Sequence, residues 1–95
     1  MKVVWSRRAV RHLTNVRDFI AEDDPKAAQQ VAICILDGVE RLAAQPHMGR
    51  PGRIVGTREL VVSGTPYVIP YRLRGERLEL MAVFHGRQKW PTKLR

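Results

Sequence analysis

GTRELVVSGTPYVIPYRLRGERLELMAVFHGRQKWP, residues 56–91, is the stretch that decides the fold, because it predicts three consecutive strands joined by two tight turns. The strands are expected at residues 57–63, 67–74 and 76–85, with the SGTP and RGE segments as turns. Pro70 cannot donate a ladder hydrogen bond, so it should lie at a sheet edge or a bulge. Four apolar residues alternate on one face of the third strand and should pack on the core: Leu78, Leu80, Ala82 and Phe84.

The chain before this stretch predicts one strand and a pair of helices. Residues 2–5 (KVVW) form a short apolar run that is typical of a strand. Ser6 can cap a helix at residues 7–22, and Asp24 can cap a second helix at residues 25–44 that begins with a proline. The fold class is therefore α+β, with an N-terminal strand and an antiparallel helical hairpin packed on a small antiparallel β-sheet.

Size and composition predict one domain over residues 1–95. The hydrophobic fraction of 44% is ordinary for a globular protein of this length. The one cysteine, Cys34, lies in the apolar VAICIL segment, so no intrachain disulfide is expected. Neither a signal-peptide pattern nor an apolar run of membrane-spanning length is present, which predicts a cytoplasmic protein without a membrane partner.

The positive charge is concentrated in the second half of the chain. Residues 1–47 hold seven Lys+Arg and six Asp+Glu, or +1. Residues 48–95 hold ten and three, or +7, which completes the net charge of +8. This asymmetry favours a polyanionic partner such as nucleic acid, the ribosome or an acidic protein segment.

The long loop at residues 45–56 leads into the first cluster of candidate binding residues. Arg50, Arg53 and Arg58 bring three guanidinium groups near one another, which suits phosphate or carboxylate contacts. A solvated loop is the structural alternative. His12, His47 and His85 are scattered without a Cys/His ligand spacing, so we expect no metal site and no cofactor.

The segment HGRQKWP after the last strand supplies the second cluster. His85 could act as an acid or base, Arg87 and Lys89 could hold phosphates, and Trp90 could stack on a base. In the structural alternative, His85 forms a local hydrogen bond and Trp90 covers the open end of the core.

The predicted elements and motifs follow one another in this order: a short strand, a helical hairpin, a G-R loop, GTREL, PYVIPYR and a strand that ends in HGRQKWP. This order resembles the RelE/ParE superfamily, the toxins of bacterial type II toxin–antitoxin modules, over essentially the whole chain. The resemblance implies a small cognate antitoxin that wraps and neutralises the toxin. It also implies that operator DNA is contacted only through the antitoxin.

The resemblance leaves the target open. ParE-like members inhibit DNA gyrase, and GTREL and PYVIPYR are closer to that side. RelE-like members cut messenger RNA on the ribosome without a metal, which here implies four catalytic candidates: His85, Arg53, Arg72 and Arg87. The other candidates would contact nucleic acid or another target: Arg50, Arg58, Lys89 and Trp90.

Two differences from the nucleases weigh against cleavage. Those enzymes commonly carry an arginine three residues before the strand tyrosine, whereas this chain has Val68 before Tyr71, and their C-terminal tyrosine has no clear match. We therefore expect inhibition of gyrase, with ribosome-dependent mRNA cleavage as the alternative. A non-toxic module that only binds the antitoxin and regulates the operon is a third hypothesis.

Overall fold

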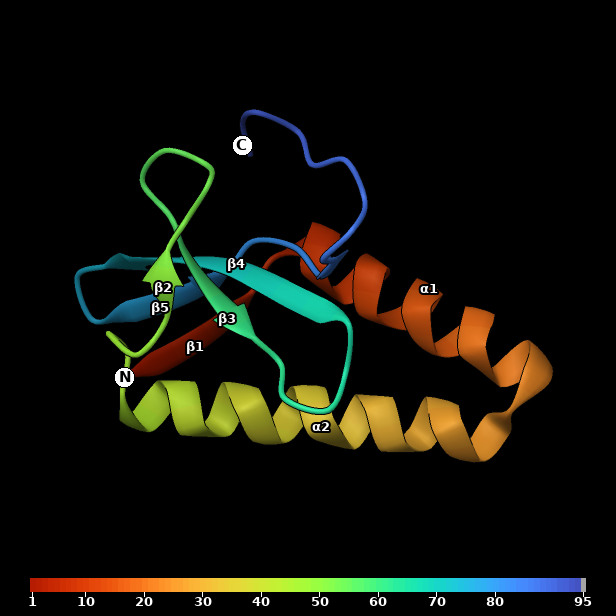
Figure 1. Ribbon diagram of the computed structural model, residues 1–95. Helices are drawn as coiled ribbons and strands as arrows, with labels where there is room; N and C mark the ends of the chain where they lie inside the picture. The colour runs from red at the N-terminus through yellow and green to blue at the C-terminus, as the bar shows by residue number, and fades with distance from the viewer. Residues whose placement is uncertain (95) are drawn as a thin grey trace.

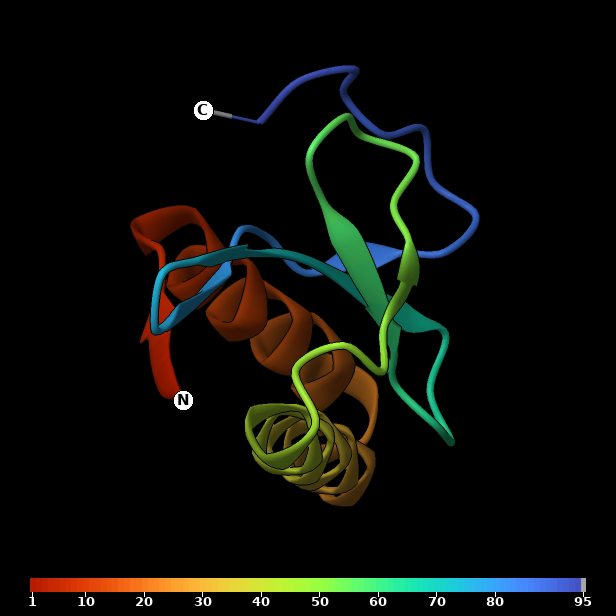
Figure 2. The ribbon, with the colours of Figure 1, turned by 90° about the vertical axis from the view of Figure 1, so that its left-hand side faces the viewer.

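A computed structural model describes residues 1–94 of the chain. Its helices are α1 (Arg7–Asp23) and α2 (Pro25–Ala44), and its strands are β1 (Lys2–Trp5), β2 (Arg50–Pro51), β3 (Arg58–Val61), β4 (Tyr67–Arg74), β5 (Arg77–Leu80) and β6 (Phe84–His85). The two helices form a hairpin along one side of the sheet, as Figure 1 shows. The loop between β2 and β3 and the C-terminal tail extend from the opposite side (Figure 2). The predicted α+β class is confirmed.

Both helices begin where the capping residues predicted. The Ser6 hydroxyl accepts a hydrogen bond from the Ala9 backbone N at 3.0 Å, and Asp24 Oδ1 accepts one from the Ala27 backbone N at 3.1 Å. Each cap satisfies a backbone N–H that has no partner within the helix. The Ser6 hydroxyl also donates to the Met81 carbonyl at 3.0 Å, which ties the start of α1 to the sheet. Within residues 1–94, no helix combines the length and hydropathy that a membrane crossing requires.

The sheet is mixed, whereas the sequence predicted an antiparallel one. The strand order is β1-β5-β4-β3-β2, and β6 pairs with β4 beyond β5. β1 lies parallel to β5, and the other pairings are antiparallel. A parallel pair needs a long connection, and the helical hairpin lies within that connection.

The third predicted strand, residues 76–85, is not continuous. Leu80 lies opposite Tyr71 and Phe84 opposite Val68, so the segment from β5 to β6 contains one more residue than the facing part of β4. This is a bulge, and Pro70 lies beside it, with its carbonyl accepting a hydrogen bond from the Met81 N at 2.9 Å. The prediction that Pro70 lies at a sheet edge or a bulge is confirmed, and the bulge is the alternative observed.

The strict alternation expected through this segment also fails at the bulge. Met81 and Val83 were expected on the face opposite to Ala82, yet both are buried, at 5% and 4% exposure. The backbone N of Val83 leaves the ladder and donates to His12 Nδ1 on α1 at 3.2 Å. The strand is therefore interrupted by a tertiary contact with a residue far away in the sequence.

Tyr71 anchors the loop at residues 45–56, which contains β2. Its hydroxyl donates to the Pro46 carbonyl at 2.8 Å and accepts from the Gly49 N at 3.0 Å. A Cβ at Gly49 would collide with the Tyr71 ring and hydroxyl, so only glycine allows this approach. The core that supports the anchor joins both helices to the sheet and includes Ile35, Leu42, Ile69, Leu78 and Leu80.

Candidate functional site

Glu59 lies at the centre of a group of side chains on the sheet face that the helices leave uncovered. Its neighbour Leu60 belongs to the core, and the alternation of the strand places Glu59 on the other face. Glu59 is only 2% exposed, although it is a carboxylate. A carboxylate at such low exposure is stable only with cationic and hydrogen-bonding partners.

Two arginines of the preceding loop supply these partners. Arg50 Nε donates to Glu59 Oε1 at 2.9 Å. Arg53 donates to Oε2 twice, from its backbone N at 2.8 Å and from its Nε at 3.1 Å. Burial by itself raises the pKa of Glu59, but the hydrogen bonds from Arg53 and Arg50 outweigh it and hold the pKa below its ordinary value. Two cations predicted for phosphate or carboxylate contacts are thus bound to a carboxylate of the same chain.

Trp90 covers this group from the C-terminal tail. The Arg53 guanidinium carbon lies 3.6 Å from the centroid of the indole ring, a cation–π contact. The indole Nε1 donates to the His85 carbonyl at 3.2 Å, and the ring lies 4.9 Å from the Phe84 ring. We call the four side chains that meet here the Glu59 cluster: Arg50, Arg53, Glu59 and Trp90.

His85 lies beside this cluster at the end of β6 and is held by its own turn. Its Nδ1 accepts a hydrogen bond from the Arg87 backbone N at 3.1 Å, and its backbone N donates to Gln88 Oε1 at 2.7 Å. The imidazole meets the Tyr67 ring edge to face at 5.7 Å. Since Nδ1 is an acceptor, the ring proton of the neutral imidazole is on Nε2.

Arg72 and Arg58 are engaged away from His85. Arg72 Nε donates to Glu79 Oε1 at 2.6 Å, and this hydrogen bond is the main reason that the pKa of Glu79 is lowered. Arg58 donates to the carbonyls of Gly49 at 3.0 Å and His47 at 3.2 Å. Arg72 is therefore bound on the outer face of β4 and β5, and Arg58 is bound to the loop at residues 45–56.

Arg87 and Lys89 have exposed side chains in the tail. Within residues 1–94 neither forms an ion pair with a carboxylate. The structure thus brings Arg50, Arg53, Trp90 and His85 together, and the backbone N of Arg87 contacts His85. Arg58 and Arg72 are bound to other partners, and the Lys89 side chain is exposed. Among the described residues, no group of three His, Cys, Asp or Glu side chains lies close enough to hold a metal ion.

Residues 3–90 match the family model described as the ParE toxin of the type II toxin–antitoxin system, parDE. The chain belongs to this family. A candidate toxin of Sinorhizobium fredii, Y4kP, is 44% identical over 93 residues, which cover 98% of this chain and 96% of that protein. Toxin RelE2 of Caulobacter vibrioides is 37% identical over 85 residues, which cover 90% of this chain and 94% of that protein.

A solved structure agrees with this assignment. The chromosomal ParDE toxin–antitoxin system from P. aeruginosa matches with a TM-score of 0.79 and 25% identity, over 90% of this chain and 95% of that chain. The predicted membership of the RelE/ParE superfamily is confirmed. The chain is the toxin of a type II toxin–antitoxin system, and its family implies a cognate antitoxin as partner.

Sequence reasoning missed two residues of this ParE-family toxin. Glu59 lies in the GTREL motif. The signal that could have identified it is an acidic residue between an arginine and two apolar residues of a strand. His12 was noted only as one scattered histidine, yet it lies 5.3 Å from the Phe84 ring and accepts from Val83. Burial lowers the pKa of His12 from 6.5, and the nearby Arg11 and Arg8 lower it further.

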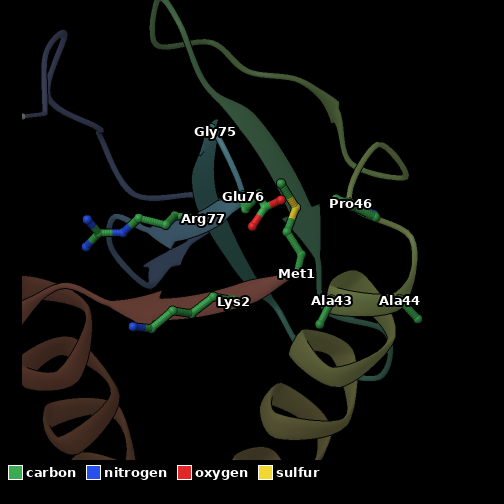
Figure 3. Close-up of a pocket in the computed structure, with 8 residues that line it drawn as sticks. All are labelled: Met1, Lys2, Ala43, Ala44, Pro46, Gly75, Glu76 and Arg77. Carbon is green, nitrogen blue, oxygen red and sulfur yellow. The ribbon is translucent and has the colours of Figure 1, made fainter.

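A hollow on the described surface is separate from these residues. It measures about 730 Å³ and lies between the start of β1, the end of α2 and the β4–β5 turn, as Figure 3 shows. Its charged lining consists of Lys2, Glu76 and Arg77. None of the predicted site residues lines it, so the candidate site is a surface cluster and not this hollow.

Proposed function

We propose that this toxin inhibits growth by binding DNA gyrase, and that its candidate site recognises a partner without cleaving RNA. The toxin would act as a single domain over residues 1–95 in the cytoplasm, and its antitoxin would neutralise it there. The observation that carries the proposal is the position of Glu59, whose carboxylate occupies the centre of the arginine cluster.

A ribonuclease that works without a metal needs cations at the phosphate where negative charge develops. Arg50 and Arg53 already bind Glu59, and Arg72 binds Glu79. A phosphate would have to displace a carboxylate that is held by charge-assisted hydrogen bonds. The arginines are therefore better placed to shape a binding surface than to stabilise a transition state.

The hydrogen bond at His85 also favours binding over cleavage. A general base accepts a proton on a free lone pair. The Nδ1 lone pair of His85 is taken by the Arg87 N–H, and Nε2 carries the ring proton in this arrangement. His85 would have to break its turn before it could take a proton from a ribose hydroxyl.

The β4 residue Val68 gives further support. It is 5% exposed and pairs with Phe84 across the sheet, so the place where nucleases of the superfamily commonly carry an arginine is part of the apolar packing. The buried hydroxyl of Tyr71 is bound to Pro46 and Gly49, which makes this tyrosine a structural anchor.

Ribosome-dependent cleavage is the competing function, because relatives of the chain carry the name RelE. It would require Arg53 to leave Glu59 and His85 to release the Arg87 N–H. The two functions predict different first targets, and a direct test can separate them.

The test adds the purified chain to two assays in parallel. In the first, gyrase supercoils relaxed plasmid, and in the second, ribosomes translate a defined messenger RNA. We expect supercoiling to stop while the messenger RNA stays intact, and addition of the antitoxin should restore supercoiling. Cleavage of the messenger RNA with unimpaired supercoiling would contradict the proposal.

A further inference from the structure

The cations of this chain fall into two groups by their partners. The ion pairs among residues 1–94 engage five arginines: Arg17, Arg50, Arg53, Arg72 and Arg74. At the start of α1, by contrast, Arg7, Arg8 and Arg11 form no ion pair with a described carboxylate, and Lys93 of the tail forms none either. The positive charge that is free for a partner therefore lies partly at α1 and the tail.

Arg8 and Lys93 meet in a small hollow between the first turns of α1 and the C-terminal tail. The hollow measures about 250 Å³, and six residues line it: Arg8, His12, Phe84, Pro91, Lys93 and Leu94. None of them is acidic. We call this hollow the α1–tail pocket.

His12 supplies a third polar group to the pocket. Its Nδ1 accepts from the Val83 N–H, so the neutral ring presents an Nε2–H as a donor. The charged side chains that face this ring are Arg8 and Arg11 from α1 and Lys93 from the tail. Burial and the two arginines lower the pKa of His12, which fits a positive potential that no carboxylate among residues 1–94 offsets.

We propose that the α1–tail pocket binds a phosphate group of a nucleic-acid backbone. Arg8, Lys93 and His12 line it, and a guanidinium fork, an ammonium group and an imidazole N–H are each donors to phosphate oxygens. Its volume of about 250 Å³ lies below the roughly 300 Å³ at which pockets for drug-sized ligands begin, which suits one phosphate.

The surroundings favour a nucleic-acid strand over an acidic peptide. The exposed side chains of Arg7, Arg11 and Lys89 lie near the pocket in sequence and could take neighbouring phosphates. A bound peptide would seek backbone hydrogen bonds, and the lining residue Pro91 has no N–H to offer. This contact belongs to the toxin itself, so it goes beyond the expectation that operator DNA is reached only through the antitoxin. It also holds whether the toxin targets gyrase or the ribosome.

The experiment measures binding of the purified chain to a labelled DNA duplex of about 20 base pairs by fluorescence anisotropy, between about 50 and 200 mM salt. The test variant is Arg8→Gln with Lys93→Gln. The matched control is Lys26→Gln with Arg77→Gln, which removes the same charge from exposed positions outside the pocket. Urea unfolding of each variant establishes that it is folded.

We expect the pocket variant to bind roughly tenfold more weakly and to lose about 1 from the slope of log affinity against log salt, because one phosphate contact is removed. The control variant should stay within about twofold of the wild type. Equal weakening in both variants would show that only net charge matters and would overturn the site. An undetectable duplex affinity, or tighter binding to an acidic peptide of equal charge than to the duplex, would overturn it as well.

A second measurement locates the contact with the smallest probe. Inorganic phosphate added to the wild-type chain should shift the NMR resonances of the His12 ring and of the Arg8 amide in a saturable way. The same titration of the pocket variant should leave the His12 ring unshifted. Shifts confined to residues outside the pocket would contradict the assignment.

Discussion

The Glu59 cluster and the α1–tail pocket are built from the same kinds of side chain and reach opposite electrostatic outcomes. In the first, Arg50 and Arg53 surround a carboxylate that is 2% exposed. In the second, Arg8 and Lys93 face a hollow that no acid of residues 1–94 lines. In the first, both arginines are bound to a carboxylate of the same chain, and the second is open to an anion.

The difference shows that a cluster of arginines does not by itself identify an anion site. What decides is whether the fold supplies a carboxylate of its own. The register of β2 with β3 brings Arg50 directly opposite Glu59. Near α1, the tail contributes Lys93 and apolar residues to the pocket, so the charge there stays available.

Neutralising the central carboxylate of the Glu59 cluster should have the largest effect on the free energy of unfolding. Glu59→Gln leaves Arg50 and Arg53 without their counter-charge, and we expect a loss of about 2–3 kcal/mol in the free energy of unfolding. Glu40→Gln removes an exposed carboxylate on α2 and should change it by less than about 0.5 kcal/mol. Urea unfolding measures both, and a Glu59→Gln variant as stable as the control would contradict a structural role for the cluster.

A smaller effect on the free energy of unfolding is expected at His12, which lines the α1–tail pocket. The folded state holds the pKa of His12 below 6.5, so the neutral ring stabilises the fold. This contribution is complete above pH 6.5 and is lost as pH falls from there through the lowered pKa, because protonation then favours the unfolded chain. We therefore expect stability to decrease on acidification from about pH 7.5 to 5.5.

The control for this effect is His47, which is exposed. His12→Gln should flatten the decrease between about pH 7.5 and 5.5, whereas His47→Gln should preserve it. Urea unfolding at each pH provides the measurement. An unchanged pH dependence in His12→Gln would show that the burial of His12 beside Arg11 and Arg8 does not cause the loss of stability.

Local sequence signals predicted much of the fold. Ser6 and Asp24 fixed the starts of both helices, and the proline at the start of α2 agreed with them. Tyr67–Arg74 was predicted with its observed bounds because turn residues flank it on both sides. These features depend on neighbours within a few residues, which a sequence displays directly.

The site was less predictable because its contacts join distant segments. The partner of Glu59 depends on the register of β2, and β2 lies within the expected loop. The break at Met81–Val83 depends on His12, which is 71 residues from Val83. Four predicted residues do gather around Glu59 or beside it, but no local pattern reveals that a buried carboxylate binds both arginines.

The most direct test of a function without RNA cleavage replaces His85 by asparagine. In His85→Asn the amide oxygen can still accept from the Arg87 N–H, while the group that could transfer a proton is gone. The measurement is growth after induction of the chain without its antitoxin, with antitoxin binding as the control for folding. We expect growth arrest equal to that of the wild type. Loss of growth arrest in a variant that still binds the antitoxin would contradict it.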